Sequence, residues 1–377
     1  MAGIYFHIPF CKQACHYCDF HFSTNRSQRR EMVNALQKEL RLRADYINEP
    51  VETIYFGGGT PSLLPGDEIA GLVHEAYSLF SVRPDAEITL EANPDDLSVS
   101  KLGELRASGI NRLSIGIQSF DDTILMFLNR AHDRTAAWRC IPDARDAGFS
   151  NISLDLIYAI PGQSGAIFAN DIKAALQLSP EHISAYSLTI EDKTVFGKWA
   201  ARGKISAPTD DHAAEQLAQL IETLESQGYA QYEISNFAKP GYYSKHNSSY
   251  WKGVPYLGVG PGAHSYNLVS RQANISNNAI YIKELARDAV PATVEVLTVA
   301  DKINDYLLTT LRTSWGTDLI KIKEEFNIDL LALHRHYVQR LVDEHMAELK
   351  ETHLVLTKKG KMIADKISSD LFVTAIT

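Results

Sequence analysis

Apolar and polar residues alternate with two different periods along the first half of the chain. Short runs rich in β-branched and aromatic residues, the pattern of strands, cover residues 3–8, 53–58, 87–92, 112–117, 152–157 and 182–188. Stretches with helical spacing lie between them, at 27–46, 66–80, 98–107, 134–146 and 166–177. Strands that alternate with helices predict a parallel sheet in an α/β fold. Six such repeats favour a (β/α)6 barrel, closed or incomplete, over a short doubly wound sheet.

The pattern changes after about residue 208. A helix is predicted over 208–227, and the aromatic stretch HNSSYWKGVPYLGVGPGAHSY follows at 246–266. After about 297 the chain reads as mainly helical, and HLVLTKKGKMIADKI at 353–367 predicts a strand, a turn and a last helix. We therefore expect two domains, 1–295 and 296–377, of which the second is winged-helix-like.

Composition and charge narrow the class of protein. The 377 residues are 45% hydrophobic and 22% charged, the balance of an ordinary globular protein. The net charge of −9 argues against a general nucleic-acid binder, which would carry a basic excess. No apolar run reaches the ~18 residues of a membrane span, and the N-terminus lacks the pattern of a signal peptide. We expect a cytoplasmic protein, in which thiols stay reduced.

Three of the four cysteines lie close together directly after the first predicted strand. Cys11, Cys15 and Cys18 have the spacing C-x3-C-x2-C. A disulfide does not suit the expected compartment, and a redox pair of Cys15 and Cys18 leaves Cys11 unused. Zinc could take three thiolates and a nearby histidine, whereas an iron–sulfur cubane could take three thiolates and keep one iron open. The spacing favours the cluster, with zinc as the alternative. We interpret the fourth cysteine, Cys140, as a buried structural thiol.

Polar residues stand at the ends of the strands that follow. In a barrel of parallel strands the carboxyl ends form the binding face. The second strand ends in GGGTP (57–61), and the next four end in or carry Glu91, Gln118, Asp155 and Ser187. The glycines let a ligand approach the backbone closely. These residues predict a polar mouth that faces the cysteine loop.

Several motifs together resemble a known family. They are YFHIPFCKQACHYCDF, YFGGGTPSLL, EANPDDL, RLSIGIQSF, LNRAH, DLIYAIPGQ and GVGPGAHSY. The chain resembles the radical S-adenosylmethionine superfamily and, within it, the coproporphyrinogen dehydrogenase-like (HemN/HemW) family, over nearly its whole length. The resemblance implies an incomplete TIM-like (β/α)6 radical SAM barrel.

The resemblance also implies roles for single residues. Cys11, Cys15 and Cys18 would ligate a 4Fe-4S cluster, and S-adenosylmethionine would bind the open iron. Its reductive cleavage would give a 5′-deoxyadenosyl radical. The residues implied to bind S-adenosylmethionine are Tyr5, near the adenine, Gly58, Gly59 and Thr60, at the methionine end, and Glu91, Gln118, Arg130 and Asp155, with Ser187 counted among them.

Two branches of this family differ in function. One contains the enzyme that decarboxylates coproporphyrinogen III to protoporphyrinogen IX, and the other contains heme chaperones. The enzyme branch has a fourth cysteine where this chain has Phe20, and a long extension before the first strand, which we expect to be absent here. HNSSYW matches the HNxxYW pattern of the chaperone branch. We therefore favour a heme chaperone of the HemW branch, with the oxidase as the alternative.

Heme as cargo calls for a ligand and for partners. Imidazole is a common axial ligand of heme iron, and His246 of HNSSYW is the candidate, with His264 as its rival. Expected partners are heme or another tetrapyrrole, proteins that accept heme, and electron donors. Nucleic acid is not expected, and a peripheral contact with a membrane is left open.

Overall fold

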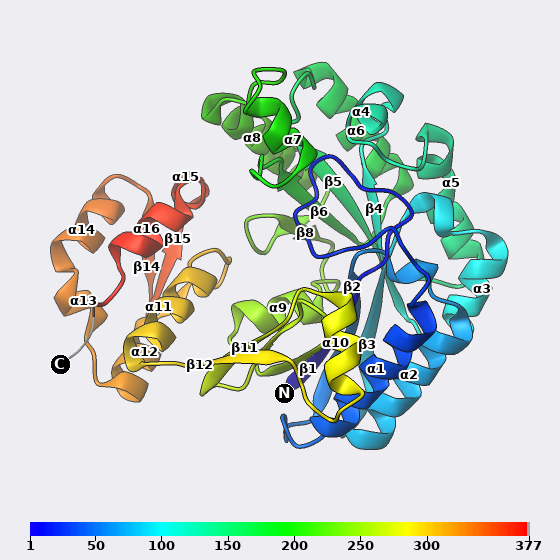
Figure 1. Cartoon of the computed structure of the whole chain (residues 1–377). Coiled ribbons are helices and arrows are strands. Elements are labelled where there is room, and N and C mark those ends of the chain that lie inside the picture. The colour runs from blue at the N-terminus through cyan, green and yellow to red at the C-terminus, as the bar shows by residue number, and fades with distance from the viewer. Residues whose placement is uncertain (375–377) are drawn as a thin grey trace.

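The computed structural model describes residues 1–374, which form a large α/β lobe and a smaller C-terminal lobe (Figure 1). The strands of the large lobe are β1 (Ala2–Ile8), β2 (Val51–Gly58), β3 (Val82–Ala92), β4 (Arg112–Gln118), β5 (Ile152–Tyr158), β6 (His182–Ser187), β7 (Ala230–Gln231), β8 (Asn236–Ala238), β9 (Tyr256–Val259), β10 (His264–Tyr266), β11 (Ser270–Asn274) and β12 (Ala292–Val296). The α-helices are α1 (Arg29–Leu42), α2 (Gly66–Leu79), α3 (Val99–Ala107), α4 (Asp122–Phe127), α5 (Arg134–Asp146), α6 (Gly165–Leu178), α7 (Val195–Ala200), α8 (Asp210–Ser226), α9 (Lys245–Trp251) and α10 (Asn278–Leu285). The short 3-10 helices η1 (Pro61–Leu63) and η2 (Pro94–Asp96) follow β2 and β3.

All twelve strands form one sheet, in the order β12-β11-β10-β9-β1-β2-β3-β4-β5-β6-β8-β7. Strands β1 to β6 are parallel and lie in chain order, as the pattern predicts. Strand β9 adds to β1 in parallel, and β8 adds to β6 antiparallel. Because β12 and β7 are the outer strands of this order, the barrel stays open, which confirms the incomplete barrel. The six strands beyond β6 were not predicted.

The parallel strands have two chemically different faces. Strands buried on both faces usually read as continuous apolar runs. Here Ile88, Leu90 and Ala92 of β3 belong to the apolar core, whereas Glu87, Thr89 and Glu91 point to the other face. The same alternation holds in the neighbouring strands. Helices α1, α2, α3, α5 and α6 cover the outer, apolar face (Figure 1), so the inner face of the half-barrel is polar.

A buried ion pair joins the first helix to the added strands. Glu39 is fully buried and lies 3.1 Å from the Arg43 guanidinium. Its carboxylate also accepts from the backbone N–H of Gly260 at 2.9 Å and from Asn274 Nδ2 at 2.8 Å, while Arg43 donates to Ser265 Oγ at 3.0 Å. A buried pair of charges is tolerated when further hydrogen bonds satisfy it. This network fixes β9–β11 beside β1.

The C-terminal lobe has its own core and its own small sheet. Its helices are α11 (Val299–Thr310), α12 (Leu319–Phe326), α13 (Leu330–Leu333), α14 (Arg335–Asp343), α15 (Lys358–Lys361) and α16 (Ala364–Asp370), and its strands are β13 (Thr317–Asp318), β14 (Ala347–Lys350) and β15 (His353–Leu356). The strands form an antiparallel sheet in the order β13-β15-β14, and a separate apolar cluster lies between sheet and helices. This agrees with a mainly helical, winged-helix-like module, in which β13 and β14 were not predicted.

Within residues 1–374, no helix combines the length and the apolar character that a membrane-spanning segment requires. Cys140 lies on α5 with 2% of its surface exposed, as expected of a structural thiol.

Candidate functional site

The three clustered cysteines lie on the loop that follows β1 (dark blue in Figure 1). Cys11, Cys15 and Cys18 are partly exposed, and none forms a disulfide. Partial burial is the main reason that the pKa of Cys11 is raised to about 11 and that of Cys18 to about 12. Both are therefore protonated thiols at neutral pH unless a bound cation holds them as thiolates.

Hydrogen bonds hold this loop to two different elements. On one side, Lys12 Nζ lies 2.8 Å from Asp95 Oδ2, at η2. On the other side, Gln13 Nε2 donates to Asn129 Oδ1 at 2.7 Å, and Asn129 Nδ2 donates to the carbonyl of Ala14 at 2.7 Å. Asn129 lies just beyond the C-terminal end of α4, next to the capping residue Leu128. The cysteines are thus placed by the ends of β3 and α4 as well as by β1.

The glycine segment after β2 packs directly against the end of β1. Gly58 has φ +105°, and a Cβ there would lie 2.6 Å from the His7 ring. A Cβ on Gly59 would lie 2.7 Å from the carbonyl oxygen of Phe10. Only glycine fits both positions without displacing the cysteine loop. The segment therefore serves close packing in addition to any contact with a ligand.

Two carboxyl groups face the inside of the mouth. Glu91 accepts from the Tyr55 hydroxyl at 2.8 Å and from the N–H of Gly58 at 3.2 Å. Burial, with the nearby charge of Asp155, raises the pKa of Glu91 to about 7. Asp155 accepts from Ser114 Oγ at 3.3 Å, and burial raises its pKa to about 6. Paired acceptors of this kind suit the hydroxyl or amine groups of a ligand.

Arg130 links the cysteine loop to β3 and β4. Its Nη1 lies 3.4 Å from Cys15 Sγ and 3.3 Å from the Tyr17 hydroxyl. Its Nη2 donates to the carbonyl of Gly116 at 2.7 Å and to Asn93 Oδ1. Arg130 is therefore held beside the cysteine loop by four contacts, and its side chain is half-buried.

Tyr5, Gln118 and Ser187, the other residues predicted to bind the cofactor, make fewer contacts with the rest of the predicted site. The Tyr5 ring stacks on that of Tyr55 at a centroid distance of 6.1 Å, near the glycine segment. Gln118 ends β4 with φ +69°. Ser187 is exposed at the end of β6. Within residues 1–374, no hydrogen bond joins Ser187 to the other predicted site residues.

His246 is buried below the mouth, on α9. It is 2% exposed, its Nδ1 lies 2.8 Å from Thr53 Oγ1, and its Nε2 lies 2.9 Å from the Tyr250 hydroxyl. The ring also stacks on Tyr55 at 4.8 Å. Both ring nitrogens thus have partners, and this geometry gives no support to His246 as a heme ligand. The rival histidine, His264, is exposed.

No three histidine, cysteine or acidic side chains of residues 1–374 converge closely enough to hold one metal ion. Three thiols on one short loop, two of them within reach of the donors Thr60 and Arg130, fit the ligand set of a cluster that keeps one iron open.

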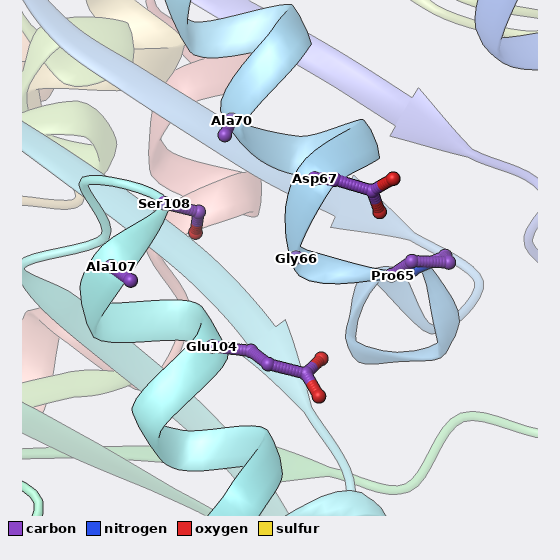
Figure 2. Close-up of a pocket in the computed structure, with 7 residues that line it drawn as sticks. All are labelled: Pro65, Gly66, Asp67, Ala70, Glu104, Ala107 and Ser108. Carbon is purple, nitrogen blue, oxygen red and sulfur yellow. The ribbon is translucent and has the colours of Figure 1, made fainter.

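A second hollow, of about 450 Å³, lies away from the mouth between α2 and α3 (Figure 2). It is lined by Pro65, Gly66, Asp67, Ala70, Glu104, Ala107 and Ser108. None of these seven residues belongs to the predicted site.

Some residues of the site were not predicted from the sequence. Tyr55, Asn93 and Tyr17 all contact predicted residues. Two of them could have been found from strand periodicity, because residues i and i+2 of a strand point to the same face. Tyr55 precedes Gly57 by two residues, and Asn93 follows Glu91 by two. Tyr17 lies in the loop, where no periodicity exists to place it.

Comparison with known proteins agrees with this geometry. Residues 5–175 match the Radical SAM superfamily, and residues 297–363 match the HemN C-terminal domain. The heme chaperone HemW of Bacillus subtilis is 36% identical over 97% of this chain and 98% of its own. That of Escherichia coli is 39% identical over 70% of this chain and 69% of its own. The solved structure of coproporphyrinogen III oxidase (HemN) from Escherichia coli superposes with a TM-score of 0.84, at 25% identity, over 99% of this chain and 90% of that one.

The fold and the two matched segments define a radical SAM protein with a HemN-type C-terminal region. The chain belongs to the HemN/HemW family, on the branch of the heme chaperone HemW. Both expectations drawn from the motifs are thereby confirmed.

The raised pKa of Glu91 predicts a pH-dependent stability. Between the ordinary value of 4.5 and about 7, the folded protein keeps a proton that the unfolded chain has released. Stability should therefore fall as pH rises through this window, by about 3 kcal/mol if the whole shift is realised. In Glu91→Gln, the thermal midpoint of the protein without cofactors should fall less between pH 5 and pH 8 than in the parent. Glu104→Gln, at an exposed position, should behave like the parent, and equal pH profiles for all three proteins would contradict the prediction.

Proposed function

We propose that the chain is a heme chaperone that carries a 4Fe-4S cluster on Cys11, Cys15 and Cys18 and binds S-adenosylmethionine beside it. One observation carries this proposal: three partly exposed thiols lie on a fixed loop at the mouth of a half-barrel whose strand ends are polar. A cluster held by these cysteines would, once reduced, supply the electron for reductive cleavage of S-adenosylmethionine. The protein's part is to bind, orient and shield that cofactor.

The residues of the mouth divide this work among them. Glu91 and Asp155 offer carboxylate oxygens to amine and hydroxyl groups, and Arg130 offers a fixed positive charge to a carboxylate. The Gly58–Thr60 segment lets the methionine end approach the backbone. Tyr5 gives a flat face for an adenine. Gln118 and Ser187 would also bind S-adenosylmethionine, and Ser187, exposed at the end of β6, is the least supported of the set.

We propose that the tetrapyrrole is carried by the protein as cargo and is not converted as a substrate. Phe20 occupies the position of the fourth cysteine of the oxidase pattern and is 73% exposed. Relatives that match 96–97% of this chain are named heme chaperones. The oxidase remains the second candidate, because the solved structure that matches over 99% of the chain is that of HemN. Heme-accepting proteins and electron donors are proposed partners.

We also propose a cellular location and a domain boundary. A cytoplasmic location is supported by the reduced state that the clustered thiols need. The division into domains at residue 296 is supported by the separate apolar cluster, whose first residue is Ile303.

Anaerobic reconstitution with iron and sulfide should give a brown protein with about four irons per chain and broad absorption near ~400 nm. Cys15→Ala should lose most of this absorption, because it removes one of three ligands. Cys140→Ala, which changes a buried cysteine on α5, is the matched control and should keep it. A colourless parent that binds one zinc ion would refute the cluster.

S-adenosylmethionine should bind to the reconstituted protein and yield 5′-deoxyadenosine after reduction. Asp155→Ala should weaken binding by about 1–3 kcal/mol, because it leaves hydroxyl or amine groups of the ligand without an acceptor. Ser187→Ala should weaken it less, since Ser187 lies at the exposed rim. Calorimetric titration measures both, and unchanged affinity in Asp155→Ala would show that the residue roles implied by the family do not apply here.

The protein should bind heme and release no stoichiometric carbon dioxide from coproporphyrinogen III. Because both nitrogens of His246 have partners, His264→Ala should shift the heme absorption spectrum more than His246→Ala, provided that a histidine is axial. Heme titration of both variants tests the ligand. Repeated turnover of coproporphyrinogen III in the presence of a reductant would establish the oxidase instead.

A further inference from the structure

Asn93 lies between two hydrogen-bond donors that point at two different cysteines. It follows β3 with extended backbone and directly precedes Pro94 of η2. Its Nδ2 donates to Thr60 Oγ1 at 3.2 Å, and its Oδ1 accepts from Arg130 Nη2. The orientation of the amide is fixed by chemistry, because a guanidinium has no acceptor and must face the oxygen. One side chain therefore contacts both donors.

Each of these donors continues to a sulfur atom. The Thr60 hydroxyl lies 3.6 Å from Cys11 Sγ. Since it accepts from Asn93, its own hydrogen is left to point at that sulfur. Arg130 Nη1 lies 3.4 Å from Cys15 Sγ, while its Nη2 is held by Asn93 and by the carbonyl of Gly116. The amide thus orients a neutral donor and a charged one at the same time.

We propose that Asn93 is a positioning residue, which aims Thr60 at Cys11 and Arg130 at Cys15 and thereby raises the reduction potential of the cluster. This inference rests on the proposed cluster. Hydrogen bonds to the sulfurs are among the factors that set the potential of an iron–sulfur centre. Reduction adds negative charge, and donors stabilise that charge. The groups behind the direct partners orient them, which is the usual role of such an outer layer.

An aspartate at position 93 would not do the same. Its carboxylate would still accept from Arg130, but it would also accept from Thr60. The Thr60 hydrogen would then turn away from Cys11. The amide is therefore required for donation to Cys11, whereas any acceptor serves to hold Arg130. Asn93→Leu removes both links at similar side-chain size.

The test is the midpoint potential of the reconstituted cluster, measured by redox titration with electron paramagnetic resonance in the absence of S-adenosylmethionine. Asn93→Leu and Thr60→Val should each lower the potential, and Asn93→Asp should lower it as well. The double variant Asn93→Leu/Thr60→Val should shift it by less than the sum of the single shifts, because Asn93 acts on Cys11 through Thr60. Thr60→Ser, which keeps the hydroxyl, should stay close to the parent.

Controls separate a role in positioning from a role in folding. Asn151→Leu changes an asparagine that directly precedes β5, at the opposite end of the strands from the cysteine loop, and should leave the potential unchanged. Iron content and circular dichroism should match the parent in every variant that is compared. If Asn93→Leu cannot hold a cluster, Thr60→Val and Asn93→Asp carry the test.

The outcomes distinguish this inference from the proposed function. A parent that assembles no 4Fe-4S cluster overturns both. A loaded parent whose potential is unchanged in Asn93→Leu, or whose Asn93 and Thr60 shifts add fully, overturns the role of Asn93 alone. Heme binding is measured separately and does not affect this result.

Discussion

The open half-barrel depends on one constraint, which is that most polar groups on the inner face of its sheet must find hydrogen-bond partners within the protein. A buried polar group without a partner is costly. Here the partners come from within: Ser153 pairs with His182 at 2.8 Å, and His182 pairs with Tyr232 at 2.8 Å. On the other side Thr53 reaches His246. The first series of hydrogen bonds joins β5, β6 and the segment after α8, and the second joins β2 to α9. The segment after α8 and helix α9 therefore complete the interior that the six parallel strands leave open.

The same constraint explains why the mouth is fixed before any cofactor arrives. Glu91 is held by Tyr55 and the glycine segment, and Arg130 by Gly116 and Asn93. The cysteine loop then lies on groups that already have a defined orientation. A site that must bind a cluster and a charged cofactor side by side benefits from such rigidity, because less ordering remains to be done on binding. The three thiols are carried by the loop and not by the sheet.

The sequence predicted the six parallel strands, and the site residues proposed from it lie at the strand ends, because both follow from local signals. Period-two patterns place strands, and the carboxyl ends of parallel strands meet at one edge. What it did not predict depends on distant contacts. Strands β9 to β11 are short and are held by the buried pair of Glu39 and Arg43. The pattern HNSSYW suggested an accessible histidine, yet its i, i+4 spacing on α9 gives His246 the Tyr250 hydroxyl as a partner. Spacing alone cannot tell a ligand from a satisfied core residue.

The difference between the two branches of the family can be located on this framework. The cysteine loop is held by Lys12, which contacts Asp95, and by Gln13, which contacts Asn129. Phe20, in contrast, stands where the oxidase pattern has its fourth cysteine and is largely exposed. The contacts that attach the loop to β3 and α4 come from Lys12, Gln13 and Asn129, and not from Phe20. An exposed aromatic ring gives apolar area for a flat cargo but no group that could take part in decarboxylation. The contacts that attach the cysteine loop and the exposed ring at position 20 therefore involve different residues, so position 20 can differ between the branches without changing the contacts of Lys12 and Gln13.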